Sequence, residues 1–241
     1  MPVIFGDSSP RTRTRARDAI RATAWTARSA GAWAALVVWI ETDVIHVAVP
    51  LGPSFLSILG IILGLLLVFR TNTSYDRWWE GRRLWGQLVN ISRGLAHQLD
   101  AQLPTAAPQR GEYADALLQF PRALAEHLRR PRGAPGPHVP NQLVQTLSHA
   151  VHRDVVAGHL PREAIVSLTP ILLAFDDVTG ACERIRNTPI PFSYSSYIKQ
   201  FVLLYALIMP FGLVREFGYG TVIASMFTFF ATMGLELLAT E

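Results

Sequence analysis

The 241-residue sequence has a single cysteine, Cys182, and few charged side chains. One cysteine excludes an intrachain disulfide. Charged residues make up 17% of the chain, below the roughly 25% of a soluble domain, while 50% of the residues are hydrophobic. We find no convincing strand pattern, no glycine-rich phosphate loop, no nucleophile motif and no paired catalytic carboxylates. This composition disfavours an enzyme and favours an all-α membrane protein.

The basic residues that are present fall into two blocks. Six Lys and Arg lie in residues 11–28 and fourteen in residues 70–186, and only Lys199 and Arg215 lie elsewhere. Apolar segments alternate with these blocks, which is typical of a membrane protein that follows the positive-inside rule. A nucleic-acid-binding protein would instead need a basic stripe with interleaved aromatic residues. We therefore expect membrane lipid, and not nucleic acid, as a partner.

Four apolar stretches predict four transmembrane helices. The first is interrupted by Glu41 and Asp43 and is long enough only if its helix starts near Ala22. The second follows Pro53, which suits the first position of a helix, and its 19 residues from Leu51 to Phe69 would span about 28 Å. The expected spans are residues 29–49, 51–75, 197–217 and 219–238.

The charge distribution also predicts the topology. The basic segment 1–28 and the long stretch 76–196 are expected in the cytoplasm, and the loop after the first span, without Lys or Arg, outside. With an even number of spans, both termini lie on the same side of the membrane, which we expect to be the cytoplasm. The expected location of the protein is the inner membrane of the cell. Residues 76–196 are too many for a loop and predict a helical cytosolic domain. Its pattern includes a helical stripe of Leu84, Leu88, Ile91, Leu95 and Leu99 and a proline-rich connector at 128–141,.

One line of residues on the second span has spacing i, i+4, i+8. It consists of Ser57, Ile61, Leu65, Phe69 and Thr73. Several copies of this helix around an axis would form an apolar ring between polar ends, which can gate ions by dewetting. The same spacing also fits ordinary lipid-facing or packing side chains, with Gly60 and Gly64 allowing close helix contact. The residues alone leave both interpretations open.

Three segments carry a resemblance to a known family. Phe69 to Arg93 reads FRTNTSYDRWWEGRRLWGQLVNISR, Cys182 to Phe201 reads CERIRNTPIPFSYSSYIKQF, and Met233 to Glu241 reads MGLELLATE. Together they resemble the prokaryotic bestrophin-type ion channels, and they occur in the order and between the spans expected of that family.

The resemblance implies a homopentamer around one pore. Each subunit of such a channel contributes four membrane helices and a helical cytosolic region, and its second membrane helix lines the pore. The family's apolar neck, counted back from Arg77, would consist of Ile61, Leu65 and Phe69, with Ser57 and Thr73 also lining the pore. A second, cytosolic aperture is expected at Ile165, with Val166 or Leu168 as alternatives.

The resemblance also bears on metals. Animal members bind calcium after the fourth span, but this sequence reaches Glu241 without the acidic continuation, and prokaryotic members generally lack calcium control. The end at Glu241 fits either a truncated or a naturally short form. His149, His152 and His159 complete no recognised ligand set. We therefore expect no metal site, no cofactor and no catalytic residue.

The sequence leaves the ion selectivity open. The neck carries no charge, the helix dipole at Pro53 would mildly favour anions, and Glu41 and Asp43 would oppose them. The leading hypothesis is a passive channel for small monovalent ions, either chloride or sodium. A carrier would require a charged residue at the centre of a span, and spans two to four have none. The remaining alternative is a non-conducting scaffold or regulatory protein whose cytosolic domain binds a partner.

Overall fold

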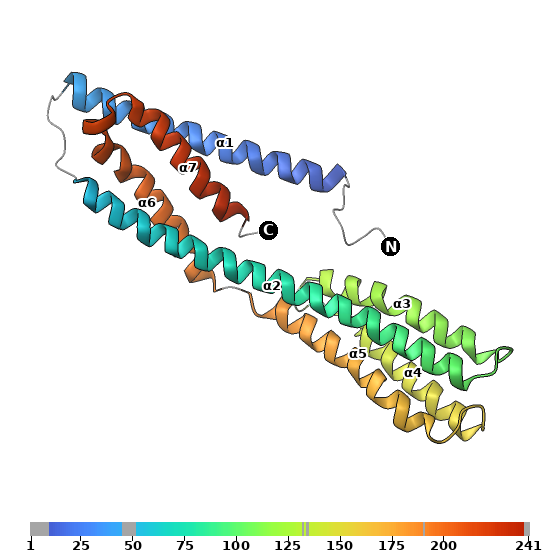
Figure 1. The fold of residues 1–241 in the computed structure, drawn as a ribbon. Helices are drawn as coiled ribbons and strands as arrows, with labels where there is room; N and C mark the ends of the chain where they lie inside the picture. Colours follow the sequence, from blue (N-terminus) through green and yellow to red (C-terminus); the bar gives the residue numbers. More distant parts are fainter. Residues whose placement is uncertain (1–9, 45–51, 132, 134, 190, 239–241) are drawn as a thin grey trace. The chain divides into compact units, whose positions relative to one another are not determined.

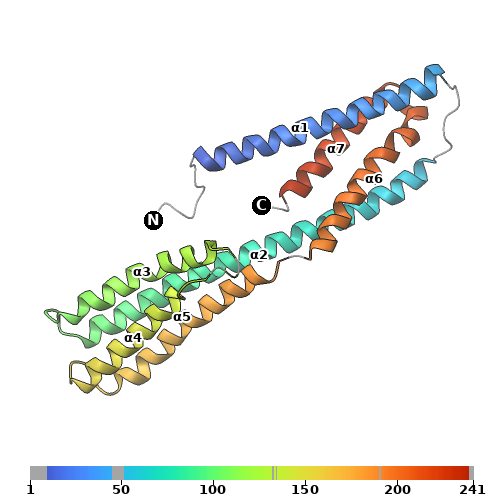
Figure 2. The ribbon, with the colours of Figure 1, turned by 180° about the vertical axis from the view of Figure 1, so that it is seen from behind.

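The described residues of the computed structural model, 10–44, 52–131, 133, 135–189 and 191–238, form only helices and their connections. This confirms the all-α prediction. In chain order (Figures 1 and 2) the elements are α1 Pro10–Trp39, the π-helix η1 Ile40–Val44, α2 Pro53–Gln102, α3 Gln109–Arg129, α4 Val139–Val156, α5 Ala164–Asn187, α6 Phe192–Phe217 and α7 Gly220–Leu238.

The chain divides into two compact units. We call residues 1–76 and 190–241 the apolar unit, and residues 77–189 the bundle unit. The 50-residue helix α2 contributes to both. The bundle unit falls within the range 76–196 that the sequence assigned to a cytosolic domain, and its location in the cytoplasm stays a prediction.

Four helical segments make up the bundle unit: the second half of α2 with α3, α4 and α5. The stripe predicted on α2 faces its core, where four of its five members are buried and Ile91 is half-buried. The proline-rich connector separates α3 from α4, as predicted. Burial of one apolar stripe per helix accounts for this arrangement. The side chains at the centre include Leu88, Leu95, Phe120, Leu124, Leu147, Leu168 and Phe175.

In the apolar unit, α1 lies along α7 (Figures 1 and 2). Gly31 permits this close approach, because a Cβ there would lie 2.5 Å from Met226 Cγ. Helices α6 and α7 form a hairpin that turns at Gly218, whose φ of 49° favours glycine,. Helix α1 begins at Pro10, well before the start near Ala22 that the sequence suggested. A small core joins α2, α6 and α7 through Leu63, Leu67, Ile198, Val202 and Phe229.

Three helices of the described residues are long and apolar enough to cross a membrane: Ser54–Gln102, Ala164–Asn187 and Ser193–Phe217. Gly220–Glu236 is apolar but shorter. On α5 (Ala164–Asn187), Leu168, Leu172, Phe175 and Val178 are buried in the core of the bundle unit, so we keep the expectation that this helix is cytosolic. The first span, expected at 29–49, lies partly outside the described residues. The four-span topology stays a prediction.

Candidate functional site

The line predicted from the sequence lies on the exposed face of α2. Ile61, Leu65 and Phe69 are 71%, 55% and 56% exposed, and Ser57 and Thr73 are exposed as well. The opposite face carries the buried residues Leu56, Leu63, Leu67 and Arg70. The fold of the single chain therefore leaves all five members of the line uncovered and buries the other side of the same helix.

This exposed face is a broad apolar surface. Ile58, Ile62 and Val68 flank the line and are also exposed. Exposing one large aliphatic side chain to water instead of burying it costs roughly 1.5–3 kcal/mol, so a face of this size needs lipid, other copies of the helix or a dewetted pore against it. At its lower end, Thr73 Oγ1 donates to the carbonyl oxygen of Phe69 at 2.9 Å, which satisfies its proton within the helix.

The two glycines of the predicted helix contact differ in their surroundings. A Cβ on Gly60 would lie 3.2 Å from the Tyr205 hydroxyl of α6, whereas a Cβ on Gly64 would meet nothing within 4 Å. Gly60 therefore serves packing inside its own chain, because only glycine admits Tyr205 so closely. Of these two glycines, Gly64 is the one with open space beside it in the chain.

An ion pair that sequence reasoning did not find lies directly after Phe69. Arg70 Nη2 is 3.0 Å from Glu236 Oε1, and the two side chains are only 3% and 7% exposed. Lys199 Nζ lies 3.8 Å from the same oxygen. The pair joins α2 to α7 across 166 positions of sequence. The signal available in the sequence was a lone charge at the end of each of two apolar runs, which names no partner.

The segment after Arg70 is anchored through α5 of the bundle unit. Arg77 donates to the carbonyl oxygens of Ile185, at 2.7 Å, and Thr188. Glu80 accepts from Arg184 at 2.5 Å. Arg77 and Arg83 each lie three residues from Glu80, a spacing at which side chains on one helix can interact. The structure instead directs Glu80 to another helix, because the bundle brings the end of α5 beside α2.

The candidate cytosolic aperture lies at the start of α5. Ile165 is 38% exposed and Val166 is more exposed still, whereas Leu168 is fully buried in the bundle core. Leu168 is thus unavailable to line an aperture, and that alternative is wrong. Ile165 remains the prediction, since it follows Ala164 at the first turn of α5 and offers an apolar side chain to solvent.

The remaining candidate residues from the sequence are Cys182 and three histidines. Cys182 is buried in the bundle core, and burial raises the pKa of its thiol, with smaller contributions from Glu183 and Glu80. It is therefore an inert packing residue. His149 and His152 are exposed on α4, and His159 Nδ1 hydrogen-bonds Gln109. A group of different residues, His127, His138 and Glu183, comes together instead, and sequence spacing gave no hint of it.

Comparison with known proteins adds to this geometry. Residues 19–241 match the sequence profile of the family described as bacterial/fungal bestrophin protein. A voltage-dependent anion channel-forming protein of Ralstonia nicotianae is 34% identical in an alignment that covers 81% of this chain and 70% of that protein. A protein of the same description from Nostoc sp. is 32% identical, with 76% and 66% covered.

Solved structures agree with the sequence comparison. A bacterial bestrophin homologue from Klebsiella pneumoniae has 26% identity and a TM-score of 0.80, with 90% of this chain and 87% of that chain covered. A point variant of that homologue gives 25% identity and a TM-score of 0.79, with 88% and 84% covered.

These findings first define a class: this is a membrane channel protein and not an enzyme. The chain belongs to the bacterial/fungal bestrophin family, which confirms the resemblance drawn from the three sequence segments. The chain spans 70% and 66% of the length of the two curated relatives described above.

Proposed function

We propose that this chain is one subunit of a bestrophin-type homopentameric channel that conducts small monovalent ions passively. In this proposal the exposed line of α2 faces the pore axis, with Ile61, Leu65 and Phe69 as the neck. The protein lies in the inner membrane with both termini in the cytoplasm, and its neighbours are membrane lipid and its own copies. The names of the relatives, anion channel-forming proteins, favour anions as the permeant class.

One observation carries the proposal: the fold buries one face of α2 and leaves the neck face of the same helix uncovered. A helix in contact only with lipid would not need polar side chains above and below an apolar line, as Ser57 and Thr73 provide. A ring of Ile, Leu and Phe side chains has no charge with which to choose an ion. It acts by excluding water, which raises a dehydration barrier that is lower for large, weakly hydrated ions.

The buried pair Arg70–Glu236 supports this assignment physically. It locks α2 to α7 one residue after Phe69, so the neck side chains are carried by a helix whose rotation about its axis is fixed. Further along α2 on the same side of the neck, Arg77 is held by two carbonyl oxygens. A gate built of side chains needs such anchoring, since a rotation of one residue would turn the line away from the axis.

The test is current through purified full-length protein in a planar bilayer under a salt gradient. The variant replaces Ile61, Leu65 and Phe69 together by Ala, and we expect its open probability to rise severalfold because a wider, less apolar neck stays wetted. The matched control replaces three exposed residues of α7, Ile223, Phe227 and Phe230, by Ala, and we expect it to behave like wild type. The reversal potential of wild type gives the sign of the permeant ion.

Each outcome separates the hypotheses. Equal currents from the neck variant and wild type would show that Ile61, Leu65 and Phe69 do not form the neck, although the protein would still be a channel. Absence of current from all three proteins would favour the alternative, a non-conducting scaffold whose helical domain binds a partner. A cation-selective reversal potential would overturn the proposed anion preference alone. Replacing Ile165 by Ala in the same assay tests the cytosolic aperture. We expect this variant to change the ion selectivity and to leave the open probability set by the neck unchanged.

A further inference from the structure

Two histidines and one glutamate meet at one end of the bundle unit. His127 lies in the last turn of α3, His138 is the N-cap residue of α4, and Glu183 lies near the end of α5. The Nε2 atoms of His127 and His138 lie 2.7 Å and 2.6 Å from the same oxygen, Oε1 of Glu183. The two imidazole rings are 4.2 Å apart between centroids. Three helices thus direct two nitrogen donors and one carboxylate at a single point.

We propose that this cluster, His127, His138 and Glu183, binds a divalent transition-metal ion of the zinc class. Two imidazole nitrogens and one carboxylate oxygen form a donor set that suits Zn²⁺ and related ions and does not suit Ca²⁺ or Mg²⁺, which take oxygen ligands. The donor atoms lie within 4.8 Å of one another. Around a tetrahedral ion they would be about 3.3 Å apart, so only small side-chain movements are needed.

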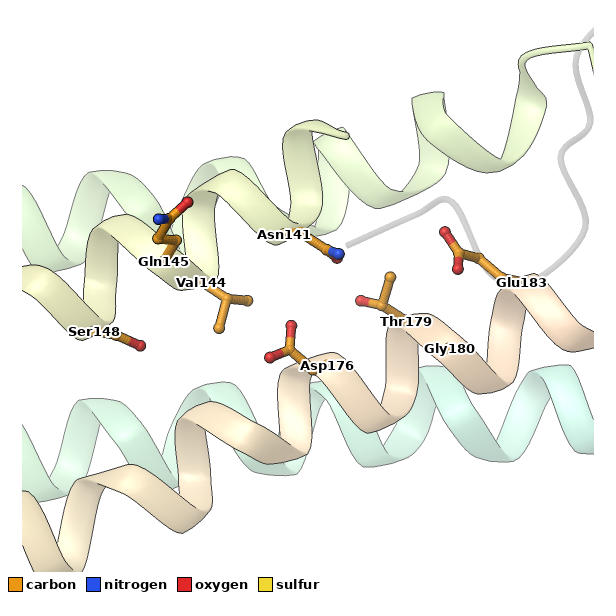
Figure 3. A pocket seen from close by; sticks show the side chains of 8 residues that line it. All are labelled: Asn141, Val144, Gln145, Ser148, Asp176, Thr179, Gly180 and Glu183. Carbon is orange, nitrogen blue, oxygen red and sulfur yellow. The ribbon is translucent and has the colours of Figure 1, made fainter. Parts of the chain in front are cut away.

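The burial of the cluster fits such a site. The side chains of His127, Glu183 and His138 are 17%, 29% and 35% exposed, so each is partly shielded and still reachable. A cavity of about 330 Å³ opens beside Glu183. Figure 3 shows Asn141 and Glu183 on its two sides and the Asp176 carboxylate pointing into it. This cavity gives an ion a polar path to Glu183.

A metal ion at the cluster would have to replace the protons that the histidine Nε2 atoms carry. His138 Nδ1 accepts from the backbone N–H of Asn141 at 3.2 Å, so a neutral His138 carries its proton on Nε2 and donates it to Glu183. A metal ion at Nε2 displaces that proton and releases the long hydrogen bond to Asn141. His127 Nδ1 is buried and has no hydrogen-bond partner among the described residues, so His127 can carry its proton there without breaking any described contact.

Charges near the cluster act in both directions. Burial works to raise the pKa of Glu183, but hydrogen bonds from His138 and His127 outweigh it and hold that pKa below its usual value. Arg130 and Arg186 line a smaller cavity of about 130 Å³ next to both histidines, and their charges oppose a cation. We therefore expect weaker binding than in a closed structural zinc site.

The test measures zinc binding to purified, tag-free, full-length protein after chelator treatment. We expect calorimetry and elemental analysis to give about one Zn²⁺ per chain, unaffected by excess Mg²⁺, and thermal unfolding to shift upward with added ZnCl₂. Glu183→Gln and His127→Gln should each lower zinc affinity at least about tenfold, the lower end of the effect of changes around a metal site. The matched control is His149→Gln, an exposed histidine of α4 outside the cluster, which should retain wild-type affinity.

Several results would overturn the proposal. If wild type, Glu183→Gln and His149→Gln bind zinc equally, the cluster is only a hydrogen-bonded clip between α3, α4 and α5. The same conclusion follows if wild type binds no zinc. Should Glu183→Gln fail to fold, His138→Gln replaces it, because Gln keeps one donor toward Glu183. The proposal concerns binding alone and does not depend on conduction, so a failed current measurement leaves this test unchanged.

Discussion

The two units of this chain use the same apolar residue types in opposite ways. In the bundle unit, Leu95, Phe120 and Phe175 are fully buried among the helices of their own chain. In the apolar unit, Ile61, Leu65 and Phe69 of α2 lie on the exposed face, while fewer residues form a small internal core. The bundle unit buries an apolar stripe of each helix in its own core, whereas the exposed apolar face of α2 in the apolar unit requires lipid or other copies.

The two units also differ in how completely their buried polar groups are hydrogen-bonded. The apolar unit buries a charged pair, Arg70 and Glu236. Two nitrogen atoms of Arg70, Nε and Nη1, lack hydrogen-bond partners among the described residues. The bundle unit buries Asp154, which accepts from the Tyr113 hydroxyl at 2.9 Å and from Arg153 at 3.2 Å. The hydrogen bonds to Asp154 satisfy a buried carboxylate and stabilise the bundle unit, whereas an incompletely paired buried charge holds two helices in one orientation at a cost in stability.

The largest effect is expected where the bundle core is emptied. Phe120 is fully buried and packs edge-on against Phe175, with ring centroids 4.8 Å apart. Phe120→Ala should lower the free energy of unfolding by about 3–5 kcal/mol. Leu118→Ala, on the same helix but 71% exposed, should change it by less than about 0.5 kcal/mol. Denaturant unfolding of the full chain followed by circular dichroism measures both, and equal losses would contradict the burial contrast.

A somewhat smaller loss is expected from the charged pair of the apolar unit. Arg70→Met leaves Glu236 buried with Lys199, 3.8 Å away, as its one cation among the described residues, and should cost about 3 kcal/mol because the remaining charge loses its close partner. The double variant Arg70→Met, Glu236→Leu should recover most of that loss. A double-mutant cycle of thermal unfolding in detergent measures the coupling, and additive losses would show that the pair does not stabilise the fold.

Two glycines test which face of the apolar unit is covered. Gly31→Ala places a Cβ within 2.6 Å of two Met226 atoms and should cost roughly 1–3 kcal/mol through overpacking between α1 and α7. Gly64→Ala meets open space within the chain and should stabilise α2 by up to about 1 kcal/mol, the difference in helix propensity. Thermal unfolding compares the two. A loss of stability or of assembly in Gly64→Ala would show that another copy lies beside Gly64.

The smallest effect concerns pH in the bundle unit. Burial, followed by the hydrogen bond to Asp154, raises the pKa of the Tyr113 phenol. Because the folded state favours the neutral phenol, its contribution is complete below the usual pKa near 10 and is lost as pH rises above it. Tyr113→Phe should cost about 1–2 kcal/mol at pH 8, and the difference from wild type should shrink above pH 10. Melting curves between pH 8 and 11 test this, with exposed Tyr197→Phe as a control.

Much of the helical framework followed from the sequence. The start of α2 at Pro53 and the stripe from Leu84 to Leu99 agree with the structure, because proline position and helical periodicity act locally. The start of α1 was misplaced, since basic residues interrupt its apolar pattern without ending its helix. The polar contacts of Arg70, Arg77 and Glu80 were missed because their partners are distant in sequence.

The amino-acid sequence by itself determined the helical class, the apolar and basic segments, the line from Ser57 to Thr73 and membership in the bestrophin family. The helical class, the segments and the line depend on composition and on periodicity along one helix, whereas the family membership rests on three segments that resemble the bestrophins. Tertiary structure alone decided that this line is the uncovered face of α2, that Leu168 is buried, that Arg70 pairs with Glu236, and that His127 and His138 share Glu183. Burial and ion pairing depend on which helices pack together, and short-range sequence patterns do not specify that packing.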